Sequence, residues 1–372
     1  MTNNNMTQPI LLPAPHQRDW RDWKDAQPKF QSPDSRFELR RSSPEDFPEI
    51  YELLNSVFEH KRSQEEYDWI YEKNPYGKAR CELIIEKSSG QIISTNARFP
   101  WPLAWGDRDM ESSQGGDSAT LTRLQRQGLV SLRIQFQQSH PWEDQQIRLS
   151  LPNQASRNAS KKYDQPTAVD PAPFAKKILD WHNFLTTKGV PAYLAKVAAP
   201  AARLVTSPSR QKKGNLRIEP IRRFYQEHQT LSLSHSRSDG FWCPHGAEWM
   251  NWRYFSHPTR EYLAHGLYSG DELQAFSVIR LDRDSAMLME LISPNIQLSQ
   301  ILLAEVERVA LEAGAKTIDT YASKGWRQWP ALKRQRYFMR PSNIYLSTRS
   351  NDHPEALLPE NWQLLPGDSD VF

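Results

Sequence analysis

The segment Gly115–Gln138 reads GGDSATLTRLQRQGLVSLRIQFQQ and contains the local pattern that decides the fold. Its first residues predict a strand that ends near Leu121, and residues 125–128 form a polar loop. A helix is expected next, with apolar positions at Leu129, Leu132, Ile134 and Phe136. The first N–H groups of a helix have no partner inside the helix and lie at the positive end of its dipole. A polar loop that opens a helix is therefore suited to bind an anion.

The elements predicted on either side give the plan of residues 37–151. Ser43, followed by a proline and two acids, is typical of a helix start, and Ser63 with Glu66 forms a capping box for a second helix. Apolar or alternating runs between turn residues predict strands at 37–41, 81–87, 91–104, 110–121 and 146–151. The predicted order is strand, two helices, three strands, loop, helix and strand.

This order and the loop together resemble the GNAT family of N-acyltransferases. Gln125 and Gly128 match the first position and the central glycine of the family's pyrophosphate loop, Q/R-x-x-G-x-G/A. Two positions depart from the pattern: Val130 replaces the last small residue, and Arg126 stands where many members have another glycine. The resemblance implies an α/β (α+β) fold with a mixed, mostly antiparallel twisted sheet, flanked by helices, whose fourth and fifth strands splay apart.

The resemblance also implies how a donor binds. Backbone N–H groups of the loop would hold the pyrophosphate of an acyl-CoA, or the single phosphate of an acyl-phosphopantetheine on a carrier protein. The pantetheine arm would lie between the splayed strands. The donor-binding residues implied are Ala119, Thr120, Leu121, Gln125, Arg126, Gln127, Gly128, Leu129, Val130, Ser131 and Asn153. The alternative is an ordinary strand-to-helix turn, with Asn153 bonded to its own backbone.

Two carboxylates and one tyrosine are the candidates for proton transfer. Asp117 and Glu111 lie on the predicted fourth strand, where a carboxylate could take the proton of an amine directly or through water. Tyr163, in SKKYDQ, lies where many family members have a tyrosine that protonates the departing thiolate. Either carboxylate could instead be a solvated edge residue, and the register of Tyr163 is open. No metal is expected, because no paired spacing is found among His140, His182, His235, His245, His257 and His265.

A second pass through a similar plan begins at Gly214, and WMNWRYFSHP (249–258) resembles stretches of proteins with two fused GNAT-like halves. Residues 296–313 predict its main helix, but Ser293-Pro294-Asn295 precedes it instead of a glycine-rich loop. We expect this half to have the fold without binding a nucleotide. The predicted organisation is an irregular arm (1–36), a donor-binding domain (37–169), a helical connector (170–213), a degenerate GNAT-like domain (214–350) and a tail (351–372).

Length and composition set outer bounds. The 372 residues suffice for two domains, and the mean hydropathy of −0.74 is that of a polar chain without an apolar run long enough to span a membrane. The first 36 residues lack a signal-peptide layout, and two cysteines favour a reducing compartment, so we expect a cytoplasmic protein. A net charge of +3 disfavours a nucleic-acid binder. The basic run 210–223 could be a solvated linker or could bind an anionic carrier protein.

The function implied is transfer of an acyl group from a thioester to an amine in a ternary complex. The resemblance extends to enzymes that acylate amino sugars and to enzymes that attach fatty acyl chains to lysine or ornithine side chains of peptides. The heavy aromatic content, with 13 Trp, 13 Tyr and 14 Phe, is compatible with a longer acyl chain. Two alternatives stay open: a non-catalytic binding protein, and a tRNA-dependent aminoacyltransferase of the kind that builds peptidoglycan bridges.

Overall fold

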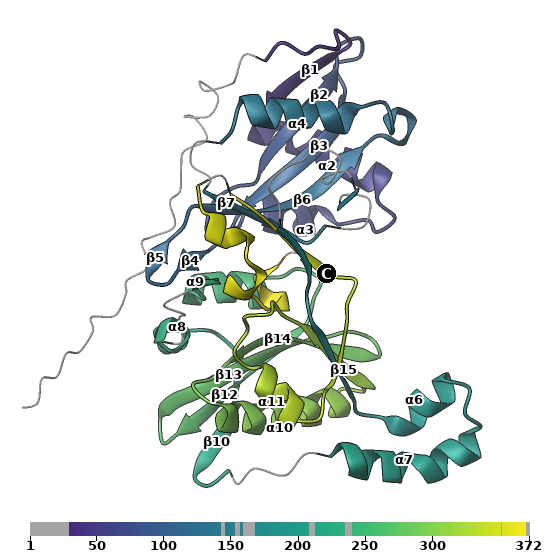
Figure 1. Ribbon diagram of the computed structural model, residues 1–372, viewed down its shortest axis with the longest axis vertical. Helices are drawn as coiled ribbons and strands as arrows, with labels where there is room; N and C mark the ends of the chain where they lie inside the picture. Colours follow the sequence, from purple (N-terminus) through teal and green to yellow (C-terminus); the bar gives the residue numbers. More distant parts are fainter. Residues whose placement is uncertain are drawn as a thin grey trace, which may run out of the picture.

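The computed structural model describes residues 30–142, 146–152, 157–158, 168–207, 213–234, 240–350 and 352–369. The WRDWKD stretch of the predicted arm (20–25) lies outside these residues. The chain forms two seven-stranded sheets, one above the other along the long axis of the molecule, with helices on each (Figure 1). This is the mixed α/β architecture, doubled along one chain, that the sequence predicted.

The first sheet has the strand order β1-β2-β3-β6-β7-β17-β8 and is antiparallel except between β6 and β7. Its strands are β1 (Phe37–Arg41), β2 (Arg80–Glu86), β3 (Ile92–Pro100), β6 (Ser112–Thr120), β7 (Ile147–Ser150), β17 (Tyr345–Arg349) and β8 (Ala168–Pro171). Helices α2 (Phe47–Val57) and α3 (Gln64–Tyr71) pack on one face, and α4 (Leu129–Ser139) packs on the other. The capping box predicted at Ser63 and Glu66 is confirmed at the start of α3.

The second sheet repeats this plan in the order β10-β12-β13-β14-β15-β9-β16, again with one parallel pair, β14 with β15. Its strands are β10 (Leu216–Ile221), β12 (Tyr262–Ser269), β13 (Glu272–Leu281), β14 (Ser285–Ile292), β15 (Thr317–Tyr321), β9 (Phe174–Ile178) and β16 (Phe338–Arg340). Its helices are α8 (Gln226–Ser234), α9 (Ala247–Met250), α10 (Ile296–Glu312) and α11 (Trp329–Arg334), and α9 continues into the π-helix η3 (Asn251–Phe255). The long helix predicted over 296–313 is confirmed as α10.

Each sheet is completed by strands that the sequence order does not suggest. Residues 168–178 and 338–349 run antiparallel as one ribbon, so β8 and β17 close the first sheet while β9 and β16 close the second. The apolar spacing from Phe174 onward predicted a helical connector, but residues 174–178 form strand β9. Because β9 lies between two other strands and is buried on both faces, it lacks the alternation by which a strand is recognised.

The remaining elements lie between and beside the sheets. A small sheet of β18 (Trp362–Gln363), β11 (Phe241–Trp242), β4 (Ala104–Trp105) and β5 (Arg108–Asp109) joins segments from both halves. Helices α6 (Trp181–Thr187) and α7 (Ala192–Thr206) extend to the side, and the 3-10 helices are η1 (Pro44–Asp46), η2 (Thr122–Leu124), η4 (Pro354–Leu357), η5 (Pro359–Asn361) and η6 (Pro366–Asp368). None of the described helices combines the length and the apolar composition that crossing a membrane requires.

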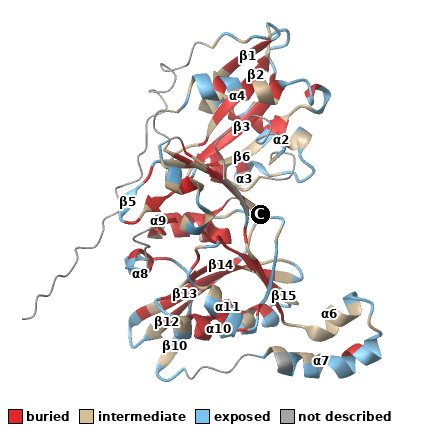
Figure 2. Cartoon of the chain, viewed as in Figure 1, coloured by how far each residue is buried: buried red, intermediate tan, exposed pale blue. Residues whose placement is uncertain are grey.

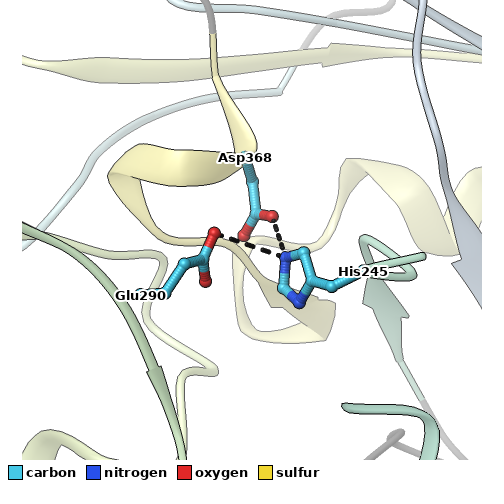
Figure 3. Close-up of side chains that lie close together, drawn as sticks. All are labelled: His245, Glu290 and Asp368. Atoms are coloured by element: carbon cyan, nitrogen blue, oxygen red, sulfur yellow. Dashed lines mark hydrogen bonds and ion pairs between the residues drawn. The ribbon is translucent and has the colours of Figure 1, made fainter. Parts of the chain in front are cut away.

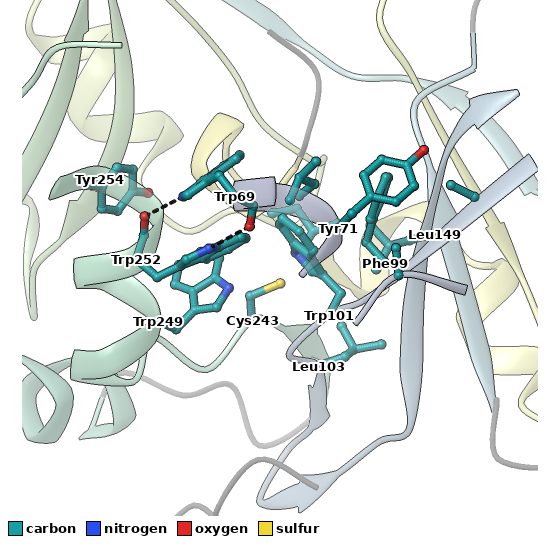
Figure 4. Packing of buried hydrophobic residues seen from close by; sticks show 14 of the residues in the cluster. Trp69, Tyr71, Phe99, Trp101, Leu103, Leu149, Cys243, Trp249, Trp252 and Tyr254 are labelled. Carbon is teal, nitrogen blue, oxygen red and sulfur yellow. Dashed lines mark hydrogen bonds between the residues drawn. The ribbon is translucent and has the colours of Figure 1, made fainter. Parts of the chain in front are cut away.

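One aromatic core joins the two halves. Burial follows the sheets and α9, whereas α6 is mostly of intermediate exposure and α7 is largely exposed (Figure 2). At the junction the rings of Trp69 and Trp252 stack with centroids 4.5 Å apart, and each indole N–H donates to the backbone carbonyl of the other residue, at 3.0 and 3.1 Å (Figure 4). Trp101 packs edge-on against Trp249 in the same cluster. Part of the large aromatic content of the sequence thus holds the halves together.

The shared core predicts that the halves unfold as one unit. Trp252→Ala should lower the free energy of unfolding by about 3–5 kcal/mol, because it empties a packed site and removes the paired indole bonds. Urea unfolding followed by circular dichroism checks this value. Tyr193→Ala, at a residue that is 72% exposed on α7, is the control and should change stability by less than about 0.5 kcal/mol. Two separated transitions in the unmutated chain would contradict the shared core.

Candidate functional site

The parallel pair in the first sheet opens after three residues. Strand β6 pairs with β7 only at Ser112–Gln114, opposite Ile147–Leu149. From residue 115 to residue 120, β6 has no ladder partner on that side among the residues that the structure describes. On its other side, β6 stays paired with β3, with an irregularity that leaves Asp117 at a φ of 44°. The result is a splayed strand pair with a bulge in the middle of its long strand.

The predicted anion loop lies at the open end of this gap. Arg126 and Gly128 both have left-handed backbones, with φ of 64° and 85°, and residues 125–128 are exposed. Helix α4 begins at Leu129 without a side-chain cap. Within the described part of the chain, the backbone N–H groups of residues 126–131 make no hydrogen bond. Six free donors therefore surround the positive end of the helix dipole, which is the arrangement that binds phosphate groups.

The other residues predicted to bind the acyl donor differ in burial and in hydrogen bonding. The carbonyl oxygens of Ala119 and Thr120 accept hydrogen bonds from Ser94 Oγ and Gln125 Nε2, and the N–H of Leu121 donates to Ile93. These main-chain groups are already engaged, so a ligand would have to share them. Leu129, the first residue of α4, is buried, Val130 and Ser131 are half-buried, and Gln127 donates to the carbonyl of Arg123. Asn153 and Tyr163 lie outside the described residues.

Asp117 is the predicted catalytic residue that the structure places in the gap. Its carboxylate accepts hydrogen bonds from Arg62 Nη1 at 2.6 Å and from the hydroxyl of Tyr71 at 3.0 Å, and its side chain is only 5% exposed. Burial raises the pKa of Tyr71 well above its ordinary value, so the phenol stays a proton donor. A cavity of about 70 Å³ reaches Arg62 from the junction of the two halves. Sequence reasoning missed Arg62 and Tyr71, because their contact with Asp117 spans about fifty residues.

Gln114 is a second group that the sequence did not single out. It is fully buried where β6 and β7 are still paired, opposite Phe99 and Leu149. Neither its amide nitrogen nor its amide oxygen has a hydrogen-bond partner within the described residues. Buried amides without partners are rare and commonly mark a site for water or a ligand. Glu111, in contrast, is exposed before the start of β6, and the structure does not bring it to Asp117.

The corresponding gap in the second sheet is filled by the chain itself. Strand β14 pairs with β15 only at Ser285–Met287, and the 3-10 helix η6 packs against β14 beyond that point. Arg253 donates to the carbonyl oxygens of Gly367 and Ser369, and Tyr321 bonds to the hydroxyl of Ser369. A side-chain carbon at Gly367 would collide with Glu290 and Tyr254. The predicted tail is therefore an integral part of the second half.

A buried charge cluster holds this segment (Figure 3). His245 Nε2 lies 2.8 Å from Asp368 Oδ1 and 3.5 Å from Glu290 Oε1, and all three residues are at least 95% buried. Burial alone would lower the pKa of His245, but the two carboxylates raise it to about 9, and burial raises the pKa of Glu290 to about 7. Such side chains could also ligate a metal ion, although here the imidazolium already supplies the compensating charge. Sequence spacing could not reveal the cluster, because its members come from three distant segments.

Comparisons with known proteins concern the fold. No model of a protein family matches the chain, and no curated protein matches its sequence. It is similar to a solved structure from Enterococcus faecalis V583 named "Probable N-Acyltransferase" (8% identity, 84% of this chain and 72% of that one, TM-score 0.61). A GCN5-related N-acetyltransferase from Anabaena variabilis is also similar, with 12% identity, 84% of this chain and 72% of that chain covered, and a TM-score of 0.59. Saccharomyces cerevisiae N-myristoyltransferase with bound myristoyl-CoA is similar over 87% of this chain and 85% of that one, with 11% identity and a TM-score of 0.53.

The cluster around His245 predicts a stability that falls with rising pH. Because its folded pKa of about 9 exceeds its ordinary 6.5, the contribution of His245 is complete below about pH 6.5 and is lost as the pH rises through 9. Glu290 acts in the same direction, since its pKa is raised from 4.5 to about 7. The free energy of unfolding should fall by roughly 3 kcal/mol between pH 6 and pH 9.5, as measured by urea titration.

Two variants separate this cluster from other titrating groups. Asp368→Asn should flatten the pH profile, because it removes one of the carboxylates that raise the pKa of His245. His353→Gln, which changes a histidine paired with Glu355 near the surface, should leave the profile unchanged. A slope that persists in Asp368→Asn would contradict the assignment.

Proposed function

Because the chain has the fold of the GCN5-related N-acyltransferases, present twice along one polypeptide, we propose that its first half transfers an acyl group from a pantetheine thioester to an amine. The observation that carries the proposal is the set of free N–H groups at residues 126–131, at the open end of the gap between β6 and β7. The fold by itself fixes no reaction, and this local geometry supplies the functional argument.

The donor phosphate binds to these N–H groups, and the exposed guanidinium of Arg126 adds charge beside them. The pantetheine arm then lies along residues 115–120 of β6, in the place of a neighbouring strand. An acyl-CoA is the preferred donor, because a pyrophosphate can reach more of the six N–H groups along residues 126–131 than a single phosphate can, and a solved relative in fold holds myristoyl-CoA. An acyl carrier protein with one phosphate remains a second donor to be compared.

The chemical step places the amine beside Asp117. The nitrogen forms a bond to the thioester carbon, and the C–S bond breaks to release the thiolate. The amine must lose one proton, which Asp117 takes directly or through water, and the thiolate gains one. Arg62 and Tyr71 hold the carboxylate in position, and the unpartnered amide of Gln114 hydrogen-bonds to the acceptor on the same face of the sheet.

The acceptor enters from the junction of the halves, where the cavity beside Arg62 lies. A primary amine is required by the chemistry, and a lysine or ornithine side chain of a peptide or an amino sugar fits that requirement. The second half acts as a platform for this acceptor, since its own gap is occupied by residues 366–369. A cytoplasmic location remains a prediction from the two reduced cysteines.

Donor binding tests the proposed loop. Gly128→Trp should abolish binding of CoA and acetyl-CoA in calorimetry, because the indole would cover the free N–H groups. Gly90→Trp is a matched control, since Gly90 also has a positive φ (72°) and open space around it but lies in the hairpin between β2 and β3. The control should bind CoA as the unmutated chain does. Failure of the unmutated chain to bind any CoA ester or acyl carrier protein would make a binding platform the better description.

Proton transfer is tested at the bulge. Asp117→Asn should lower kcat roughly 100-fold while leaving the affinity for the donor nearly unchanged, because asparagine keeps the shape but cannot accept the proton. Asparagine also tolerates the left-handed backbone at this position. Steady-state rates with a panel of primary amines provide the measurement. An unchanged kcat would assign Asp117 a positioning role for Arg62 and Tyr71.

A further inference from the structure

Two arginines lie on the α4 face of the gap, the same face as the donor loop. Arg133 of α4 donates to the carbonyl of Thr95 and to the hydroxyl of Ser118, so it bridges β3 and β6. Arg148 comes from β7 at the closed end of the gap, where its backbone pairs with Ser113. Both guanidiniums therefore lie along the path that the donor follows towards the closed end.

Arg148 lies directly over Gly115, the first residue of β6 beyond the pairing with β7. A Cβ atom at residue 115 would lie 2.7 Å from both Nε and Nη2 of Arg148, so only glycine lets the guanidinium cross the strand there. In the part of the chain that the structure describes, the guanidinium has no hydrogen-bond or ion-pair partner. Desolvation lowers the pKa of Arg148 to about 9 and that of Arg133 to about 10.

The nearby carboxylate does not satisfy Arg148. Glu82 attracts it electrostatically, but the two oxygens of Glu82 already accept hydrogen bonds from Arg98, Asn96, Gln137 and Trp142. Arg148 is partly exposed, but its Nε atom is buried without a partner among the described residues, and an anion in contact with the guanidinium would offset the cost of that burial. Arg148 is therefore a candidate to bind an anionic group.

Resting on the proposed function, we propose that the acyl group of the donor is short and ends in a carboxylate, which Arg148 binds at the closed end of the gap. A succinyl group is the simplest example. The thioester lies near Asp117, only two residues from Gly115, so a short chain suffices to reach the guanidinium.

The closed end argues against a long alkyl chain. At residues 112–114 the strands are hydrogen-bonded together, and the hydroxyl of Ser113 and the Nε atom of Arg148 are buried there without partners among the described residues. An alkyl chain would leave these polar atoms unsatisfied, whereas a carboxylate can accept from them. Trp69 and Trp252, two of the rings that suggested a fatty acyl chain, stack on each other at the junction between the halves and do not line the gap between β6 and β7.

Calorimetry of the full chain with CoA, acetyl-CoA, succinyl-CoA and myristoyl-CoA tests the proposal. Succinyl-CoA should bind at least tenfold more tightly than acetyl-CoA. Arg148→Met should remove that preference and leave the affinity for CoA unchanged. Gly115→Ala should weaken the preference by displacing the guanidinium while keeping its charge. Arg217→Met, at an exposed arginine of the second half, is the control and should keep the preference.

The outcomes are distinguishable from failure of the proposed function. Equal affinities for acetyl- and succinyl-CoA, or a preference for myristoyl-CoA, would overturn the carboxylate site and leave the acyltransferase intact. Succinyl preference that survives Arg148→Met would also overturn it. Absence of binding by CoA itself would instead remove the donor site as a whole. Thermal unfolding of each variant verifies that it is folded before its affinities are compared.

Discussion

The parallel ladder between β6 and β7 ends after three residues, and the functional argument depends on that interruption. Strand β3 holds β6 along its other edge, so β6 cannot move towards β7 without breaking an antiparallel ladder. The gap therefore persists as part of the folded state. Backbone groups left without partners at such a gap are costly unless water or a ligand binds them. The free N–H groups before α4 belong to the same opening, which makes a phosphate-bearing extended ligand the natural complement.

Each half has a parallel strand pair that stops after three residues, but different groups occupy the two gaps. In the second half the corresponding gap contains residues 366–369, which Arg253, Tyr321 and the His245 cluster hold in place. The exchange of strands through the ribbon of residues 168–178 and 338–349 ties the two sheets together. One half can thus keep an open, less stable gap because the other half and the shared aromatic core supply the rigidity. Stability and binding are divided between two copies of one fold.

The local elements of the fold were predictable because their signals are local. Capping at Ser63, the periodicity of α10 and the loop around Gly128 all reside within a few residues of sequence. Strand β9 and the filled second gap were not predictable in this way. The partners of β9 are β15 and β16, more than a hundred residues later, and its two buried faces erase the alternating pattern. The candidate site shows the same contrast between local and long-range signals. Asp117 could be proposed from its place on a predicted strand, but Arg62 and Tyr71 contact it from about fifty residues away and could not.

Composition alone does not fix the length of the acyl chain, for a related reason. A count of aromatic residues does not distinguish rings that line a slot from rings that pack against one another, and Trp69 and Trp252 do both: they stack on each other and line a pocket at the junction of the halves. Arg148 illustrates the converse. Alternation along β7 directs Ile147 and Leu149 into the core and Arg148 to the opposite face, where an arginine would ordinarily meet water. There the guanidinium lies over Gly115 and is only partly exposed, with its Nε atom buried, so its surroundings follow from tertiary structure. A charge kept in such a place is better explained by a ligand than by stability, because an apolar residue would fill the same space at lower cost.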